Sequence, residues 1–249
     1  MKERHLKILD MVNEKDRISV QELSTRLGLS VVTIRKDLEE LESEGLLRRQ
    51  HGYAAKASPD AINSRMSFRY LEKKKIAQKA VSLVESMETI MIESGSTCAL
   101  FAAELAAVND VTIITNSTYI ARSLGTSPGA KVILLGGDYD TVAEVTTGPV
   151  TELCAHEYYV DKIFVGIDGY TEENGFTNIN HTRCSTVRAL SKQADKVIVL
   201  TTSDKFGKRS VAKMFSSKEV HTVVTDSQLS PEYADILRSQ NIQVELAEI

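Results

Sequence analysis

The chain has 249 residues, of which 42% are hydrophobic, which is enough for two unequal domains with buried cores and argues against wholesale disorder. Its apolar runs are far too short to span a bilayer, and the opening MKERHLK lacks the apolar stretch of a secretory signal. Three widely spaced cysteines without a CxxC pair predict reduced thiols in the cytoplasm.

Charge is distributed unevenly along the chain, although the net charge is only −4. Residues 1–75 carry 16 basic and 12 acidic side chains, and the remainder carries 14 basic and 22 acidic ones. A basic head on an acidic body is typical of a nucleic-acid-binding module joined to another domain. The excess is small, and many solvated helical faces carry as much. The charge alone therefore does not identify a nucleic-acid-binding module, and the prediction depends on the motifs.

The first fifty residues predict three short helices in a helix-turn-helix arrangement. Ser19 followed by Glu22 predicts a capping box at the start of the second helix. Gly28 predicts the turn that follows, and Ser30 can cap the third helix. Apolar residues recur at helical spacing in the first and third helices, at Leu6, Ile8, Leu9 and Val12 and at Ile34, Leu38 and Leu41.

The third helix and the segment after it carry the predicted DNA contacts. In a helix-turn-helix, the second helix of the pair lies in the major groove, where valine methyl groups can touch thymine and arginine can reach guanine. After Gly45, the run LLRRQHGYAA predicts a hairpin with Gly52 at or near its turn, which would be a cationic wing. The predicted DNA-binding residues are Ser30, Val31, Val32, Thr33, Arg35, Lys36, Arg48, Arg49 and His51. The alternative interpretation is a small helical domain with ordinary charged faces.

The rest of the chain predicts a parallel α/β sheet. A polar linker and a helix over residues 65–84 come first. Seven β-branched runs then alternate with helical segments: TIMIES, VTIITN, KVILLGG, KIFVGID, KVIVLTT, TVVTD and QVELAEI. Such apolar strands indicate a Rossmann-like sheet covered on both faces, in which ligands bind beyond the carboxyl ends of the strands.

Small and polar residues follow five of these strands and predict a site for a phosphorylated sugar. ESGST opens a helix, whose backbone amides and dipole favour an anion, and a lysine in TSDKFGKR can add positive charge. The predicted effector-binding residues are Ser94, Gly95, Ser96, Thr97, Asn116, Gly136, Gly137, Asp168, Gly169 and Lys205. Taken one at a time, each of these loops is an ordinary turn, so the prediction depends on all of them together.

The head resembles the winged helix-turn-helix of the DeoR family of bacterial repressors. The residues that carry the match are Arg4, Ile8, Val12, Ser30, Thr33, Ile34, Arg35, Lys36, Asp37 and Leu38, which include TIRKDL. From about residue 69 to 226 the chain resembles the family's sugar-phosphate sensor domain, through ESGST, TNS, LLGG, FVGIDG and TTSDKFGKR. That sensor is in turn similar to ribose-5-phosphate isomerase. The resemblance implies that the third helix reads an operator and that Asp37 orients neighbouring side chains rather than touching DNA.

The same resemblance bears on catalysis. The isomerase has a glycine-rich stretch with a lysine, followed by a catalytic glutamate. Here the corresponding stretch resembles NINHTRCSTVR, which lacks the glycines and the lysine, and Cys184 stands where the glutamate would be. Gly166 also replaces an acid. We therefore expect no catalytic residues and no enzyme activity. His181 and Cys184 have a metal-like spacing, but no second pair supports it, so no metal and no cofactor are expected.

These observations combine into one prediction. The chain is expected to be an α/β protein with a winged helix-turn-helix over residues 1–57, a linker and connecting helix over 58–84, and a sugar-phosphate-sensing domain over 85–249. It would be a homo-oligomeric repressor of carbohydrate genes, with an operator DNA and a phosphorylated sugar as partners and no membrane partner. Two alternatives stay open: an isomerase-like enzyme with a DNA-binding head, and a DNA-binding or assembly module with a vestigial ligand site.

Overall fold

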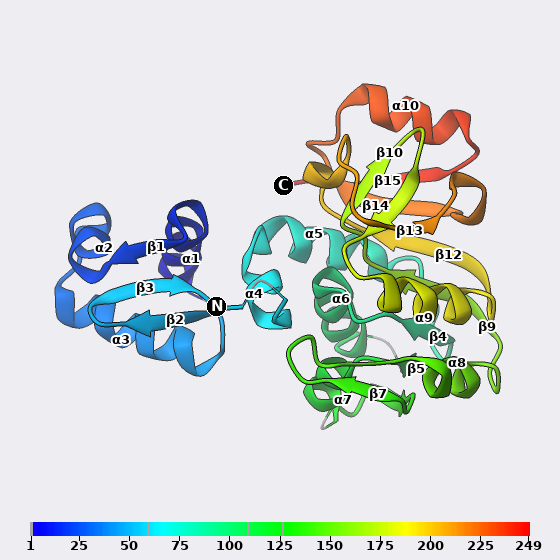
Figure 1. Ribbon diagram of the computed structural model, residues 1–249, viewed down its shortest axis with the longest axis horizontal. Coiled ribbons are helices and arrows are strands. Elements are labelled where there is room, and N and C mark those ends of the chain that lie inside the picture. The colour runs from blue at the N-terminus through cyan, green and yellow to red at the C-terminus, as the bar shows by residue number, and fades with distance from the viewer. Residues whose placement is uncertain (1, 59, 109, 126) are drawn as a thin grey trace. The chain divides into compact units, whose positions relative to one another are not determined.

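The computed structural model describes residues 2–58, 60–108, 110–125 and 127–249, and the chain divides into two compact units (Figure 1). The N-terminal unit ends at Tyr70 and the C-terminal unit begins at Leu71. The single helix expected over residues 65–84 is wrong, because two helices occupy this region, α4 (Ile62–Ser67) and α5 (Tyr70–Val81). Arg69, between them, has a φ of 53°, which a continuous right-handed helix does not allow.

The N-terminal unit has the element order of a winged helix-turn-helix. Its elements are α1 (Glu3–Lys15), β1 (Arg17–Ser19), α2 (Val20–Leu27), α3 (Val31–Ser43), β2 (Leu47–Gln50) and β3 (Tyr53–Lys56), followed by α4. The three strands form an antiparallel sheet in the order β1-β3-β2. The sequence did not predict β1, because three residues are too few for a recognisable alternation.

Serine caps start the two helices of the motif, as predicted. The Ser19 Oγ accepts from the Glu22 N–H at 3.0 Å, and the Ser30 Oγ accepts from the Thr33 N–H at 3.1 Å. The capping box at Ser19 is only half formed, which corrects the prediction. The Glu22 carboxylate does not return to the cap but accepts from the Lys15 ammonium at 2.7 Å.

One apolar cluster joins the helices of this unit to its sheet. Its buried residues are Ile8, Leu9, Val12, Ile18, Val20, Leu23, Ile34, Leu38, Leu41, Leu46, Leu47 and Ala54. The hairpin between β2 and β3 turns through His51 and Gly52, whose φ values are 41° and 84°. Two successive positive φ values are the signature of a tight type I′ hairpin turn, which favours glycine at its second position, so the predicted place of Gly52 is confirmed.

The C-terminal unit contains a seven-stranded parallel sheet. Its strands match the seven predicted runs: β4 (Thr89–Ile92), β5 (Val111–Thr115), β6 (Ala130–Leu134), β9 (Val160–Val165), β12 (Ala194–Leu200), β14 (Thr222–Asp226) and β15 (Gln243–Ala247). They lie in the order β15-β14-β12-β9-β4-β5-β6, and each pair is parallel. The predicted α/β fold class is confirmed.

Helices cover both faces of this sheet (Figure 1). Beyond α5 they are α6 (Ser96–Ala106), α7 (Thr118–Leu124), α8 (Pro149–Ala155), α9 (His181–Ser191) and α10 (Pro231–Ser239), with the short 3-10 helices η1 (Ser203–Lys205) and η2 (Ser217–Glu219). Ile163 and Val199 pack with Leu190 of α9 and Leu237 of α10. Phe164 points to the opposite face, where its ring lies 4.3 Å from that of Phe101 in α6.

Two small antiparallel sheets accompany the large one, and the sequence did not predict them because their strands are short and polar. They are β10 (Gly169–Thr171), β11 (Gly175–Asn178) and β13 (Ala212–Phe215), and the pair β7 (Asp138–Asp140) and β8 (Val145–Thr147). In the described part of the chain, no helix combines the length and the apolar character that crossing a membrane requires.

The strand order creates a switch point between β4 and β9. After β4 the chain adds β5 and β6 on one side, and it later adds β9, β12, β14 and β15 on the other side. Ligands of open α/β sheets bind outside the carboxyl ends of the strands at such a point. A ligand is therefore expected to bind at the loops that follow β4 and β9.

Candidate functional site

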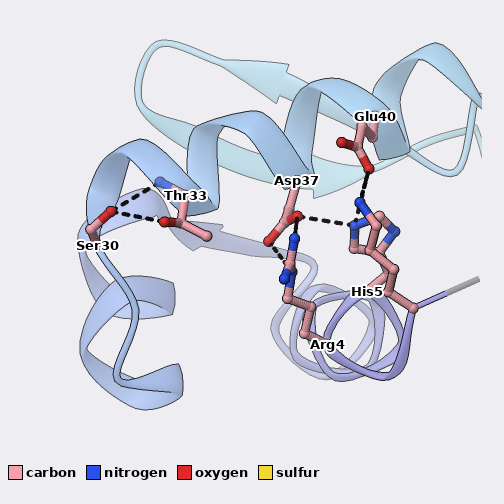
Figure 2. A network of polar contacts seen from close by, with 7 residues as sticks. Arg4, His5, Ser30, Thr33, Asp37 and Glu40 are labelled. Atoms are coloured by element: carbon pink, nitrogen blue, oxygen red, sulfur yellow. Dashed lines mark hydrogen bonds and ion pairs between the residues drawn. The ribbon is translucent and has the colours of Figure 1, made fainter.

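The outer face of α3 presents most of the side chains predicted to read DNA. Val32 is 75% exposed, and Arg35 and Lys36 are exposed, with no side-chain partner among the described residues. Val31 differs from the prediction, because it is only half exposed and packs against the apolar cluster of the unit. Ser30 is exposed and held in the helix cap, so its hydroxyl serves the start of α3 (Figure 2).

The wing keeps two of its three predicted cations available. Arg48 and His51 are exposed, and neither side chain has a partner in the part of the chain that the structure describes. Arg49 instead lies against α3, where its Nε donates to the Glu42 carboxylate at 2.7 Å and its Nη1 donates to Glu39 at 2.9 Å. Arg49 would have to leave these carboxylates to contact DNA, so it is the weakest member of the predicted set.

Ion pairing separates the cations of the N-terminal unit into two groups. Paired cations include Lys2 with Glu40, Lys7 with Glu3, Lys15 and Arg26 with Glu22, and Lys56 with Asp16. Within residues 2–58, the basic side chains without a carboxylate partner are Arg17, Arg35, Lys36, Arg48 and His51. All five lie on α3, on the small sheet or in its hairpin turn, and basic side chains that are not neutralised within the protein are the ones available to DNA phosphates.

A buried carboxylate fastens α3 to α1 (Figure 2). Arg4 donates from Nε and Nη2 to the two oxygens of Asp37, both at 2.7 Å, and the His5 Nε2 lies 3.1 Å from Asp37 Oδ1. Asp37 is fully buried. Burial raises the pKa of this carboxyl, but the hydrogen bonds and charges of Arg4 and His5 lower it more, so the net pKa lies below the ordinary value. The predicted orienting role of Asp37 is confirmed.

The same network includes a group that is compact enough to hold a metal ion, formed by His5, Asp37 and Glu40. Glu40 accepts from the Lys2 ammonium at 2.5 Å, and the Arg4 guanidinium donates to both oxygens of Asp37. Both carboxylates are therefore already neutralised by side-chain cations. The arrangement fits a structural clasp between two helices better than a metal site.

The structure brings the predicted effector residues to the same edge of the large sheet. Ser94, Gly95, Ser96 and Thr97 follow β4, Asn116 follows β5, Gly136 and Gly137 follow β6, Asp168 and Gly169 follow β9, and Lys205 follows β12. Neighbouring strands lie about 4.8 Å apart, so the loops after β6 and β12 are each about 10 Å from the loop after β4. The residues after β4, β5 and β9 therefore form the centre of the candidate site.

The start of α6 offers open hydrogen-bond donors. No side chain caps this eleven-residue helix, whose N-cap residue is Gly95. Among the described residues, neither Ser96 nor Thr97 has a hydrogen-bond partner for its backbone N–H or its hydroxyl. Unpartnered N–H groups together with the positive end of the helix dipole favour a bound anion.

A buried glutamate that the prediction overlooked links the loops after β4 and β9. Glu93 is 4% exposed, and its Oε2 accepts from the Gly95 N–H at 2.8 Å and from the Gly166 N–H at 3.1 Å. Its Oε1 accepts from the Ser94 hydroxyl at 3.0 Å. The two glycines meet closely, because a Cβ built on Gly95 would lie 3.3 Å from the Gly166 Cα. Glu93 therefore sets the geometry of the switch point and leaves the donors of Ser96 and Thr97 open.

Some of the remaining predicted residues hold the loops of the site in place, and others are available to contact a ligand. Asp168 accepts from the Ile179 N–H at 3.0 Å and holds the loop after β9. The Asn116 amide donates to the Thr146 carbonyl at 2.9 Å, while its Oδ1 is buried with no partner among the residues that the structure describes. Lys205 is half-buried, and its ammonium has no partner in the described ranges. Lys205 is thus the predicted cation that remains available at this edge.

The stretch NINHTRCSTVR provides no nucleophile or metal pair. Cys184 is fully buried in the apolar core, and burial raises the pKa of its thiol. His181, three residues earlier in α9, is exposed. A surface cavity of about 550 Å³ lies elsewhere, beside β11 and the segment 209–213, and contains none of the predicted effector residues.

Comparison with known proteins identifies both parts of the chain. Residues 4–59 match the DeoR-like helix-turn-helix domain, and residues 69–227 match the DeoR C terminal sensor domain. The HTH-type transcriptional regulator GolR of Listeria innocua is 30% identical over 99% of this chain and 98% of its own. The glycerol-3-phosphate regulon repressor of Escherichia coli strain K12 is 27% identical, over 98% of both chains.

Solved structures include the enzyme that the sensor domain was expected to resemble. Ribose 5-phosphate isomerase A from Methanocaldococcus jannaschii is 24% identical, and the match covers 54% of this chain and 53% of the enzyme with a TM-score of 0.40.

Proposed function

Because the chain belongs to the DeoR family of DNA-binding transcriptional regulators, which are not enzymes, we propose that it represses carbohydrate-metabolism genes and that a phosphorylated sugar modulates its operator binding. One relative, which matches over almost the full length, is the glycerol-3-phosphate regulon repressor. Glycerol 3-phosphate, from which that name is taken, is a phosphorylated polyol. The unpaired cations on α3 and the wing support the operator binding in this proposal. The open donors at the start of α6 support the second half.

The observation that carries the effector class is the set of open donors at Ser96 and Thr97, with Lys205 at the same edge of the sheet. A phosphate there would receive charge-assisted hydrogen bonds from backbone and side chains. We expect phosphorylated sugars and polyols to raise the melting temperature of the full chain in a thermal-shift screen. Ligand at 100 times its Kd stabilises a folded protein by about 2.7 kcal/mol.

The controls for this screen are the corresponding free sugars and inorganic phosphate. Free sugars should give no shift, because they lack the anion. A panel of phosphorylated sugars and polyols without any effect would contradict the proposed effector class and favour a DNA-binding or assembly module with a vestigial site. The isomerase alternative is not supported, because Glu93 already has both carboxylate oxygens engaged and Cys184 is buried.

The DNA-binding half is tested by two arginine variants. We expect Arg35→Ala to abolish discrimination between operator and scrambled DNA, because Arg35 lies on the outer face of α3 where base edges are read. Arg48→Ala should weaken binding to both DNAs about equally, because a phosphate contact carries no sequence information. Gel shifts on the operator and on a scrambled fragment measure both. Equal loss on the two DNAs for Arg35→Ala would contradict its assignment as a base contact.

We also propose that the protein acts as a homo-oligomer in the cytoplasm. One head offers few DNA contacts, and two linked heads gain affinity through their effective concentration. The partners in this proposal are a double-stranded operator and the phosphorylated effector, with no membrane partner.

A further inference from the structure

We propose that Arg17, which is stacked on Tyr53, contacts the DNA backbone and adds β1 to the DNA-binding surface of α3 and the wing. The inference rests on the proposed operator binding and extends it to a strand that sequence reasoning did not detect. Arg17 is one of the five unpaired cations of the N-terminal unit, and it lies outside both segments predicted to touch DNA.

The strand register places Arg17 beside the wing cations. Arg17 pairs with Ala55 of β3, and Ala55 pairs on its other side with Arg48 of β2. Directly paired residues share one face of an antiparallel sheet, so Arg17 and Arg48 flank the small Ala55 on the same face. The opposite face carries Ile18 and Ala54, which are buried in the apolar cluster. Arg17 and Arg48 are therefore on the outer face of the sheet.

The stack directs Arg17 toward the tip of the wing. The Arg17 Cζ lies 4.0 Å from the centre of the Tyr53 ring, and Tyr53 directly follows the turn at His51 and Gly52. A guanidinium that lies on an aromatic ring keeps its N–H edges free for other acceptors, and the stack limits its rotamer freedom before DNA arrives. Figures 1 and 2 both show the turn of this hairpin at the same end of the unit as the start of α3.

The charge of this face favours a polyanion. The side chains that share it by register are Arg17, Ser19, Arg48, Gln50, Tyr53 and Ala55, and none of them is acidic. Cations on the other face are neutralised, because Arg49 binds Glu39 and Glu42, and Lys56 binds Asp16. The sheet thus separates paired from unpaired cations by face. A face with two unpaired arginines and no acid fits a phosphate backbone better than a protein partner of mixed charge.

The test is a salt titration of operator binding with the full chain and its Arg17→Ala variant. Each neutralised phosphate contributes about −0.9 to the slope of log K against log salt. We expect Arg17→Ala to make that slope shallower by about 0.9 and to weaken binding about tenfold at fixed salt, on operator and scrambled DNA alike. Arg17→Lys should keep the slope of the parent, because it keeps the charge.

Lys7→Ala is the matched control, because it removes the same charge from the same unit while Lys7 is paired with Glu3 at 2.8 Å. Its slope should equal that of the parent. Tyr53→Phe should bind like the parent and Tyr53→Leu more weakly, since only the first keeps the ring. An Arg17→Ala slope equal to that of Lys7→Ala would overturn the inference, as would a loss confined to the operator. A parent that binds no DNA at all would instead refute the proposed function.

Discussion

Asp37→Ala is expected to destabilise the N-terminal unit strongly and to weaken operator binding. Removing this buried acceptor leaves the Arg4 and His5 side chains without their shared partner between α1 and α3. Loss of one member of a fully buried, hydrogen-bonded ion pair costs about 3–5 kcal/mol, and here the cost should be near the lower end because the Arg4 side chain is 42% exposed. A unit of this size has a total stability of roughly 4–10 kcal/mol, so the change would remove about a third of that stability or more. Circular-dichroism melts of the full chain should show the transition of the N-terminal unit at a lower temperature than in the parent and that of the other unit unchanged.

The control is Glu3→Ala, which removes a carboxylate from the same helix. Glu3 is exposed and pairs with Lys7 on the surface, where screening makes such pairs weak. Its melt should match that of the parent. If Asp37→Ala also melted like the parent and bound operator, the clasp between α1 and α3 would not matter for the head.

The same carboxyl gives the stability of the N-terminal unit a defined pH dependence. The pKa of Asp37 is lower in the folded chain than the ordinary value of about 3.9 for an unfolded one. Its contribution is therefore fully present above that ordinary value and is lost as the pH falls through the folded pKa. Melts of the parent should show a decline below about pH 4 that is smaller in Asp37→Asn, because its amide does not titrate.

The parts of the fold that the sequence predicted are those encoded by local pattern. The seven strands of the large sheet are continuous β-branched runs, and burial on both faces is what such runs favour. Ser19 and Ser30 were predictable caps because a serine before an apolar helical pattern satisfies free N–H groups. Both signals lie within a few residues, so no tertiary information was needed.

The parts that were missed depend on partners distant in sequence. In the sequence, Arg49 cannot be distinguished from the other basic residues of the wing. Only the fold places Glu39 and Glu42 of α3 beside it. Glu93 is a single letter in ESGST, and its role emerges only when the sheet order places Gly166 next to Gly95. The sequence offered one sign of this role, which was an acidic residue at the end of an apolar strand. That sign could not be interpreted without knowing that β9 lies beside β4.

Ser96→Asp is expected to keep DNA binding and to lose the response to the effector. The start of α6 tolerates an acid, because the helix dipole stabilises negative charge there. That same carboxylate would lie at the open backbone N–H groups of residues 96 and 97 and repel a phosphate. Effector coupling is typically about 1–3 kcal/mol, so the parent should show a 5- to 150-fold change in operator affinity. Lys205→Ala should reduce that change without eliminating it, because Lys205 supplies charge from a loop two strands away.

Gel-shift titrations measure this response, with a sugar phosphate that changes the operator affinity of the parent. Two further variants show whether the effect is specific to the start of α6. Ser230→Asp adds the same charge at the exposed N-cap of α10, after β14, which is three strands from β4. Aspartate caps a helix as well as serine does, so this control should respond like the parent. Ser96→Ala removes one hydroxyl without adding charge and should respond more weakly than the parent. If Ser96→Asp responded as fully as Ser230→Asp, the anion would bind elsewhere, and the open donors at the start of α6 would not be the effector site.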